Sequence, residues 1–241
     1  MTTAAGILIG NELLTGKFRD ENGEYLIKSL RARGISLGHL VMIPDSLDDI
    51  AREVRRCSEN YDMVFTSGGV GPTHDDITLE GVARAFDVEV FLHPELVASI
   101  KEMGWPMNYS TRRMASVPQG TVLIRQEGWV YPILQTRNVY ILPGVPRIFR
   151  FKLEKILEDC DGVPVCAARV FVTERESSIA ERLAHIDQEH PEVDIGSYPR
   201  FGEKEFRVIV TLESADEGAL GRAVAEVENT FETLERDVDA V

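Results

Sequence analysis

Hydrophobic and polar positions in the first third of the chain alternate between two patterns. Short apolar runs at residues 4–9, 37–43 and 63–66 predict buried β-strands. Between these runs, apolar residues recur every three or four positions over residues 20–33 and 47–60, which predicts amphipathic helices. Strands separated by helices of this length pair in parallel through right-handed crossovers. The pattern therefore predicts a doubly wound α/β fold with a mostly parallel sheet flanked by helices.

Four residues indicate where helices begin and end. Ser46, with an acidic residue three positions later, has the pattern of a capping box, and Gly34 suits a left-handed C-terminus. Thr78 is predicted to cap a third helix that continues to about residue 86. Pro94 predicts the start of a further helix.

Residues 104–136 have a weaker pattern than the segments on either side. Short strands are predicted within them at residues 122–125 and 130–134. A strand at residues 139–142 and a helix at 147–159 then complete the first domain.

A turn-forming segment, Asp161-Gly162-Val163-Pro164, predicts the boundary between two domains. Residues 1–162 form the predicted α/β domain, and residues 163–241 form a smaller α+β domain with the order β-α-β-β-α. Its strands are predicted at residues 168–173, 194–198 and 205–213, and its helices at 177–188 and 217–234.

The composition excludes several classes of protein. No apolar run approaches the roughly 20 residues of a membrane helix. The N-terminus has no basic segment before an apolar one, unlike a secretory signal, so we expect a cytoplasmic protein with no membrane partner. Its three cysteines show no C-x-x-C spacing, which argues against a disulfide framework or a zinc site.

Charge argues against nucleic acid as a partner. The formal net charge is −14, and residues 163–241 hold 18 of the 40 acidic residues but only 8 of the 26 Lys and Arg. Such a surface repels a phosphate backbone.

Unusual polar and glycine-rich segments follow four of the predicted strands. They are Gly10-Asn11-Glu12, Pro44-Asp45, residues 66–78 and Pro143-Gly144-Val145-Pro146. In an open parallel sheet, ligands bind at the carboxyl ends of the strands. We therefore expect these segments to surround one crevice.

The segment at residues 66–78, TSGGVGPTHDDIT, has the composition of a phosphate-binding loop. Gly68, Gly69 and Gly71 allow the backbone amides to approach a ligand closely, and a helix N-terminus follows. Asp75 and Asp76 would repel a phosphate unless a divalent cation bridges them. Asp45 and Glu12, from neighbouring strand ends, are candidates to complete the set of oxygen ligands.

Simpler interpretations of these residues remain open. Asp76 or Thr78 is also suited to cap the next helix, and a glycine-rich loop is often only a turn. His74 is a candidate proton donor, although an orienting or solvent-exposed role is the simpler interpretation. The prolines around Gly144 and the carboxylate of Glu12 also have purely structural explanations.

Residues 66–78, 10–14, 20–22, 44–45 and 138–146 together resemble the molybdopterin-binding (MoaB/Mog-like) domain family. They are most similar to the versions in competence/damage-inducible protein A (CinA) and in the N-terminal half of eukaryotic FAD synthase. Residues 163–241 resemble the KH-like domain that follows in those proteins. Their only G-x-x-G, Gly218 to Gly221, lies among acidic residues, so RNA binding is not expected.

The resemblance implies functional roles for particular residues. It places the two aspartates that matter for molybdopterin adenylylation at Asp45 and Asp76, with Asp75 as an addition typical of the CinA and FAD synthase branch. The ligand-binding residues that it and the strand-end clusters imply are Gly10, Asn11, Thr66, Gly68, Gly69, Gly71, Pro72, Thr73, Thr78, Pro143 and Gly144. Catalysis is expected from Asp45, Asp75 and Asp76, and metal binding from Asp45, Asp76 and Glu12.

The branch is associated with metal-dependent hydrolysis of diphosphates such as ADP-ribose or FAD. We therefore expect a nucleotide pyrophosphatase that uses Mg²⁺ or Co²⁺, with a small nucleotide or pterin ligand. A non-catalytic molybdopterin- or nucleotide-binding protein and a molybdopterin adenylyltransferase are the alternatives. Relatives of this kind usually self-associate, so a homo-oligomer is expected.

Two departures from the family affect these expectations. Asn11 stands where many relatives have Asp or Thr, which removes one possible metal ligand. The sequence ends before the amidohydrolase domain of CinA or the adenylyltransferase domain of FAD synthase would begin. Nicotinamide-nucleotide deamidation and FAD synthesis are therefore not expected.

Overall fold

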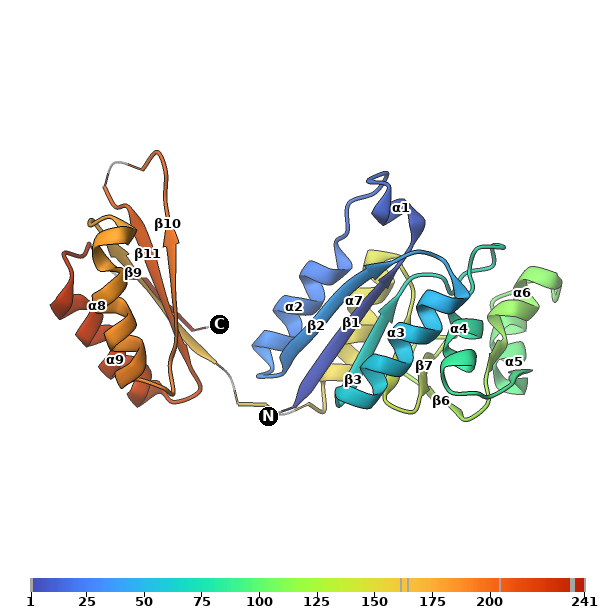
Figure 1. Cartoon of the computed structure of the whole chain (residues 1–241). Coiled ribbons are helices and arrows are strands. Elements are labelled where there is room, and N and C mark those ends of the chain that lie inside the picture. Colours follow the sequence, from blue (N-terminus) through green and yellow to red (C-terminus); the bar gives the residue numbers. More distant parts are fainter. Residues whose placement is uncertain (1, 161, 164, 204, 235–236, 241) are drawn as a thin grey trace. The chain divides into compact units, whose positions relative to one another are not determined.

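A computed structural model describes residues 2–160, 162–163, 165–203, 205–234 and 237–240, the last four by their backbone alone. The chain divides into two compact units, Met1–Gly162 and Val163–Val241, which are described separately (Figure 1). Asp161 and Pro164 of the predicted boundary turn lie outside the described residues.

The first unit is built on a six-stranded sheet with the strand order β2-β1-β3-β8-β7-β6. Strands β2, β1, β3 and β8 are parallel; β7 runs antiparallel to β8, and β6 runs antiparallel to β7. The predicted doubly wound, mostly parallel sheet is therefore confirmed. These strands are β1 (Thr3–Ile9), β2 (Ser36–Ile43), β3 (Met63–Ser67), β6 (Thr121–Ile124), β7 (Ile133–Thr136) and β8 (Val139–Leu142).

Helices cover both faces of this sheet (Figure 1). On one face, Ile50 and Val54 of α3 and Val82 of α4 pack in the same buried cluster as Ile7 of β1. The opposite face carries a second cluster, to which α2 and α7 contribute. The helices of this unit are α1 (Asn11–Leu14), α2 (Asn22–Ala32), α3 (Leu47–Asn60), α4 (Thr78–Ala85), α5 (Pro94–Glu102), α6 (Tyr109–Met114) and α7 (Pro146–Leu157).

Three of the predicted helix signals are confirmed and one is wrong. Pro94 is the first residue of α5, as predicted. The Ser46 side chain accepts a hydrogen bond from the backbone of Asp49 at the start of α3, and Gly34 adopts a positive φ of 64° after α2. Helix α4 begins at Thr78, but no side chain caps it. Thr78 fails as a cap because its hydroxyl is bonded elsewhere.

Residues 86–136 contain elements that the pattern did not predict. They are β4 (Val90–Leu92) and β5 (Ser116–Pro118), which form a separate two-stranded antiparallel sheet, and the short helix α6. The strand predicted at residues 130–134 begins only at Ile133. Residues 130–132 form no strand, and Tyr131 lines a cavity instead.

The second unit is a four-stranded antiparallel sheet in the order β10-β11-β9-β12, with two helices on one face. Alternate residues of β11 are buried, and they share one apolar cluster with α8 and α9. The last helix was predicted to extend to residue 234, but the observed helix ends at Thr230 and a further strand follows it. The elements are β9 (Cys166–Val172), α8 (Glu176–Glu189), β10 (Asp194–Pro199), β11 (Val208–Ser214), α9 (Glu217–Thr230) and β12 (Asp237–Ala240).

Across the residues described, the structure contains no helix that is both long enough and apolar enough to cross a membrane.

Asn138, at the start of β8, is predicted to stabilise the first unit. Its amide donates to the carbonyl oxygens of Ser58 (3.1 Å) and Tyr61 (2.8 Å), and its Oδ1 accepts from the Ser58 hydroxyl (2.5 Å). Asn138→Ala removes these bonds, so we expect the free energy of unfolding to fall by about 1–3 kcal/mol.

Urea unfolding followed by tryptophan fluorescence measures this loss, because Trp105 and Trp129 both belong to the first unit. Asn60→Ala is the matched control, since Asn60 is exposed and its side-chain amide donates to the Arg56 carbonyl of its own helix. Equal stabilities of the two variants would contradict the role of Asn138.

Candidate functional site

Three neighbouring strands of the first unit bring the predicted loops to one edge of the sheet. Leu8 of β1 pairs with Ser67 of β3, and Ser67 pairs in turn with Leu142 of β8. The loops that begin at Gly10, Gly68 and Pro143 therefore start side by side. The end of β2 joins them, because the Gly10 amide donates to the Ile43 carbonyl (3.1 Å).

The glycine loop requires glycine at its first two positions. Gly68 has a φ of 107°, and a Cβ placed on it would lie 2.1 Å from the carbonyl oxygen of Ile9. Gly69 has a φ of 64°, and its Cβ would lie 2.3 Å from the hydroxyl of Thr78. A side chain at either position would both strain the backbone and clash with a neighbouring loop. Gly144 of the next loop also lies against Gly68, with only 3.4 Å between its Cβ position and the Gly68 Cα.

Thr78 fixes the position of this loop through two hydrogen bonds. It is fully buried, its hydroxyl donates to the Gly68 carbonyl (2.9 Å), and its amide donates to the Gly69 carbonyl (2.9 Å). This use of the hydroxyl explains why Thr78 does not cap α4. Thr66 is buried within β3, and its hydroxyl has no hydrogen-bond partner in the described part of the chain.

The acidic half of the loop is organised around Thr73. Its amide donates to Asp76 Oδ2 (2.7 Å), and its hydroxyl lies within hydrogen-bond range of both Asp75 (2.5 Å) and Asp76. The bond from the Thr73 hydroxyl lowers the pKa of the Asp75 carboxyl. Both carboxylates thus bond to one residue, Thr73, while the His74 side chain, between Thr73 and Asp75 in the sequence, is almost fully exposed.

Arg113 of α6 fixes the same segment from outside. Its guanidinium donates to the carbonyl oxygens of Thr73 (3.0 Å) and Asp76, and it forms an ion pair with Glu80 of α4 (3.0 Å). Sequence reasoning missed Arg113, because its partners lie more than 30 positions away along the chain.

Glu12 and Asp45 lie at the ends of β1 and β2. The Asp45 carboxylate accepts a hydrogen bond from the backbone N–H of Asn11 (2.8 Å) at the start of α1. The Glu12 carboxylate folds back over Gly10, where an added Cβ would lie 2.4 Å from it. Gly10 and Asp45 thus both help to place Glu12.

The predicted metal ligands do not form a compact trio. Within the described ranges, the one set of three His, Cys, Asp or Glu ligand atoms lying within 4.8 Å of one another is His39, Glu53 and Cys57. Glu12 and Asp76 nevertheless line the same cavity. Mg²⁺ often takes one or two protein carboxylates and completes its shell with water and substrate phosphate, so this pair fits a divalent cation that is held together with a phosphate ligand.

A cavity of about 560 Å³ opens at this edge of the sheet. Eight of the predicted residues line it, namely Glu12, Gly68, Gly69, Gly71, Pro72, Asp76, Pro143 and Gly144. Gly10, Asn11, Asp45, Thr66, Thr73, Asp75 and Thr78 do not line it. Two of these seven, Thr73 and Thr78, bond to residues that do, namely Asp76, Gly68 and Gly69.

A second cavity, of about 510 Å³, adjoins the first. Glu12, Gly144 and Val145 line both cavities. Asn22 of α2 lies between this cavity and the strand ends, and its amide donates to Ser67 Oγ (2.9 Å) and to the Gly144 carbonyl (2.8 Å). Its Oδ1 is buried without a hydrogen-bond partner among the described residues.

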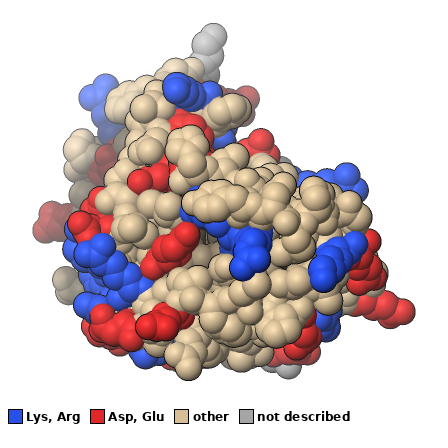
Figure 2. Space-filling view, turned by 90° about the vertical axis from the view of Figure 1, so that its right-hand side faces the viewer, with Lys and Arg blue, Asp and Glu red and all other residues tan. Residues whose placement is uncertain are grey.

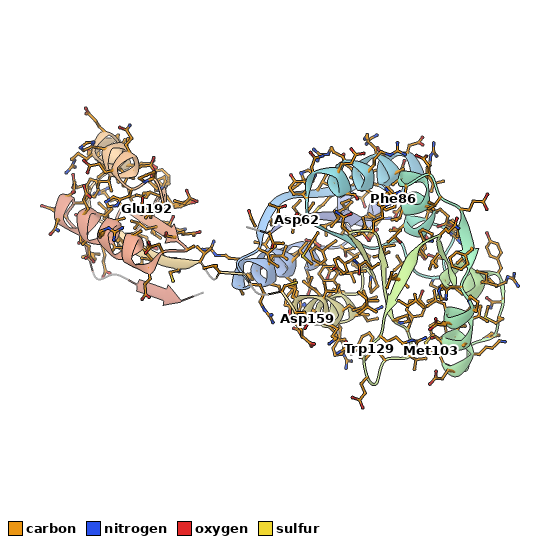
Figure 3. The ribbon with its side chains drawn as sticks, turned by 90° about the horizontal axis from the view of Figure 1, so that it is seen from below. Asp62, Phe86, Met103, Trp129, Asp159 and Glu192 are labelled. Carbon is orange, nitrogen blue, oxygen red and sulfur yellow. The ribbon has the colours of Figure 1, made fainter. Side chains whose placement is uncertain are left out.

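The far wall of the first cavity was not predicted. It consists mainly of aromatic and aliphatic side chains together with one lysine: Met103, Trp105, Met114, Trp129, Tyr131, Ile148 and Lys152. Met103 and Trp129 lie at the same edge of the first unit (Figure 3). A signal was present in the sequence, because the wall contains both tryptophans of the chain.

Comparison with family models supports the resemblance inferred from the sequence. Residues 5–162 match the family described as a probable molybdopterin-binding domain, and residues 164–236 match the middle domain of FAD synthase.

Individual relatives agree with this assignment. A protein of Archaeoglobus fulgidus is 33% identical over 222 residues, which cover 92% of this chain and 95% of that protein. A probable FAD synthase of Caenorhabditis briggsae is 31% identical over 241 residues, which cover 88% of this chain but 46% of the synthase. The chain thus corresponds to about half the length of that relative.

A solved structure supports the fold of the first unit. It is the crystal structure of the protein CinA, of unknown function, from Thermoplasma acidophilum, with a TM-score of 0.61 and 29% identity. The match covers 66% of this chain and 98% of that chain. The predicted resemblance is confirmed: the chain belongs to the molybdopterin-binding domain family and, like FAD synthase, carries the synthase's middle domain after it.

Proposed function

We propose that the first unit is a metal-dependent pyrophosphatase that hydrolyses a dinucleotide-like diphosphate of the ADP-ribose or FAD type. The observation that carries the proposal is the pair of adjoining cavities that share Glu12, Gly144 and Val145. A dinucleotide has a heterocyclic or sugar group on each side of a central diphosphate, and two connected cavities suit that shape. The relatives named FAD synthase support a nucleotide as the ligand.

The glycine loop is the proposed binding site for the diphosphate. Gly68 and Gly69 line the first cavity, and neither carries a side chain that would block a close approach to the backbone. The charged residues that line this cavity are Glu12, Asp76 and Lys152. Two carboxylates beside the loop would repel a diphosphate, so binding requires a compensating positive charge.

Glu12 and Asp76 would hold a divalent cation, with Mg²⁺ and Co²⁺ as the candidates. When bound, such a cation neutralises phosphate charge and lowers the pKa of a bound water molecule. Asp45 positions the start of α1 through its hydrogen bond with the backbone N–H of Asn11. Asp75 and Asp76 both lie within hydrogen-bond range of the Thr73 hydroxyl. Asp45 and Asp75 are therefore proposed to act through their neighbours.

The reaction adds one water molecule across the P–O–P linkage. The water oxygen forms a bond to one phosphorus, the bridging P–O bond breaks, and its electron pair leaves on the bridging oxygen. Two monophosphates and one proton are the products. Binding of a molybdopterin or nucleotide without turnover, and adenylyl transfer to molybdopterin, are the alternatives that experiment has to separate.

Release of AMP tests the proposed activity. We expect the purified protein to release AMP from ADP-ribose or FAD with Mg²⁺ or Co²⁺, and Asp76→Asn to lower the rate roughly 100-fold because a metal ligand is lost. Asp159→Asn is the matched control, since Asp159 is an exposed aspartate at the end of the first unit.

No AMP from ADP-ribose, FAD or NADH with either metal would refute the hydrolase. Binding of these ligands without turnover would then favour a binding protein, and AMP incorporated into molybdopterin would favour the transferase. Full activity in Asp76→Asn would instead remove Asp76 from the site.

Metal removal tests the proposed charge balance. With EDTA, the affinity of the wild-type protein for ADP-ribose should fall at least ~10-fold, because Glu12 and Asp76 then face the diphosphate alone. In the same buffer, Asp76→Asn should bind more tightly than the wild type, since one repelling charge has been removed. Isothermal titration calorimetry with and without EDTA measures both effects, and equal wild-type affinities would place the carboxylates away from the phosphates.

A further inference from the structure

The wall of the first cavity opposite the glycine loop contains two aromatic rings, Trp129 and Tyr131, whose positions are fixed by packing and hydrogen bonding. Trp129 stacks on Phe151 of α7, with a centroid separation of 4.1 Å and an interplanar angle of 7°. The Tyr131 hydroxyl donates to the Met114 carbonyl (2.6 Å). Both rings are therefore held in place by contacts within the protein. Aromatic and thioether side chains of this kind favour stacking with planar heterocycles.

Lys152 of α7 lies in this wall and is only 4% exposed. Its Nζ donates to the Pro132 carbonyl (2.6 Å) and lies 5.2 Å from the centroid of the Tyr131 ring and 5.9 Å from that of Trp129. No carboxylate forms an ion pair with it in the part of the chain that the structure describes, and burial lowers its pKa to about 8.

A buried ammonium without a carboxylate is unfavourable unless other groups satisfy it. An ammonium has three donors, and one strong acceptor is present here, the Pro132 carbonyl. The two ring faces stabilise the charge more weakly than a hydrogen-bond acceptor would. The remaining donor capacity suits a ligand oxygen that enters the cavity.

From this geometry we infer that Lys152 selects a planar heteroaromatic ring that carries a carbonyl oxygen, such as the lactam ring of a flavin or a pterin. The ring would stack in the aromatic wall, with its carbonyl oxygen accepting from Nζ. Adenine is disfavoured there, because it carries no carbonyl oxygen and the amino group beside its N1 and N7 would direct N–H donors at the ammonium.

This inference rests on the proposed function for the position of the phosphate. It predicts how a dinucleotide with two different rings binds: the carbonyl-bearing ring occupies the first cavity, and the other half of the molecule extends past Gly144 into the second cavity. The prediction therefore concerns ring selectivity, which can be measured whether or not the protein hydrolyses the ligand.

FMN, IMP and AMP provide the test, because each has one phosphate and IMP differs from AMP in carrying a carbonyl in place of the amino group. Dissociation constants are measured with Mg²⁺ by isothermal titration calorimetry. Lys152→Met should weaken binding of the carbonyl-bearing nucleotides roughly 10- to 100-fold, as expected for loss of a charged hydrogen bond. AMP binding should change less than about twofold.

Lys155→Met is the matched control, because it changes the same residue type on the same helix outside the cavity, where Lys155 pairs with Glu158. The fold should survive Lys152→Met, since a methionine replaces an unpaired buried charge. Quenching of the emission of Trp105 and Trp129 places each ligand in this cavity, as both tryptophans line it.

The inference fails if Lys152→Met weakens neither FMN nor IMP more than AMP. It also fails if inorganic pyrophosphate loses as much affinity as FMN, because Lys152 would then bind phosphate. Selective loss with no hydrolysis by the wild-type protein would support the ring site and refute the pyrophosphatase. Hydrolysis by the wild-type protein with no ring selectivity would support the pyrophosphatase and refute the ring site.

Discussion

The close approach of three loops at the ends of β1, β3 and β8 is the constraint on which the candidate site depends. Gly68 passes so near the Ile9 carbonyl and Gly144 that any side chain there would separate the loops. Thr78 reinforces the contact by bonding the Gly68 and Gly69 carbonyls. Because the loops meet, Glu12, Asp76 and the glycine backbone border one cavity.

Charge divides that cavity into two parts with different chemistry. Glu12 and Asp76 make one part acidic, so a phosphate can be held there only with a compensating cation. The aromatic wall is instead positively charged, since Lys152 is buried there and no carboxylate among the described residues forms an ion pair with it. The outer face over α5 and α6 shows charges of both signs scattered among uncharged residues (Figure 2). Selectivity for a ligand is therefore expected to depend on the residues that line the cavity.

The local periodicity was sufficient to predict most of the sheet. Runs such as residues 4–9 and 63–66 are buried on both faces, and their continuous apolar character reflects that burial. Residues 104–136 were harder, because α6 and β5 are only six and three residues long and their short patterns carry little signal. The aromatic wall was missed for a related reason: Trp129 and Tyr131 lie in a turn, and nothing local shows that they approach Lys152.

The sequence by itself determined the α/β architecture, the order of the loops at the strand ends, and the presence of a glycine-rich, acidic loop at residues 66–78. Those features depend on local periodicity and on residue types with narrow roles. Only the tertiary structure decided that Thr78 supports the loop rather than capping α4, that Glu12 and Asp76 line the cavity while Asp45 and Asp75 do not, and that Lys152 lies in the aromatic wall. These outcomes depend on contacts between residues far apart in the chain, whose geometry no local pattern encodes.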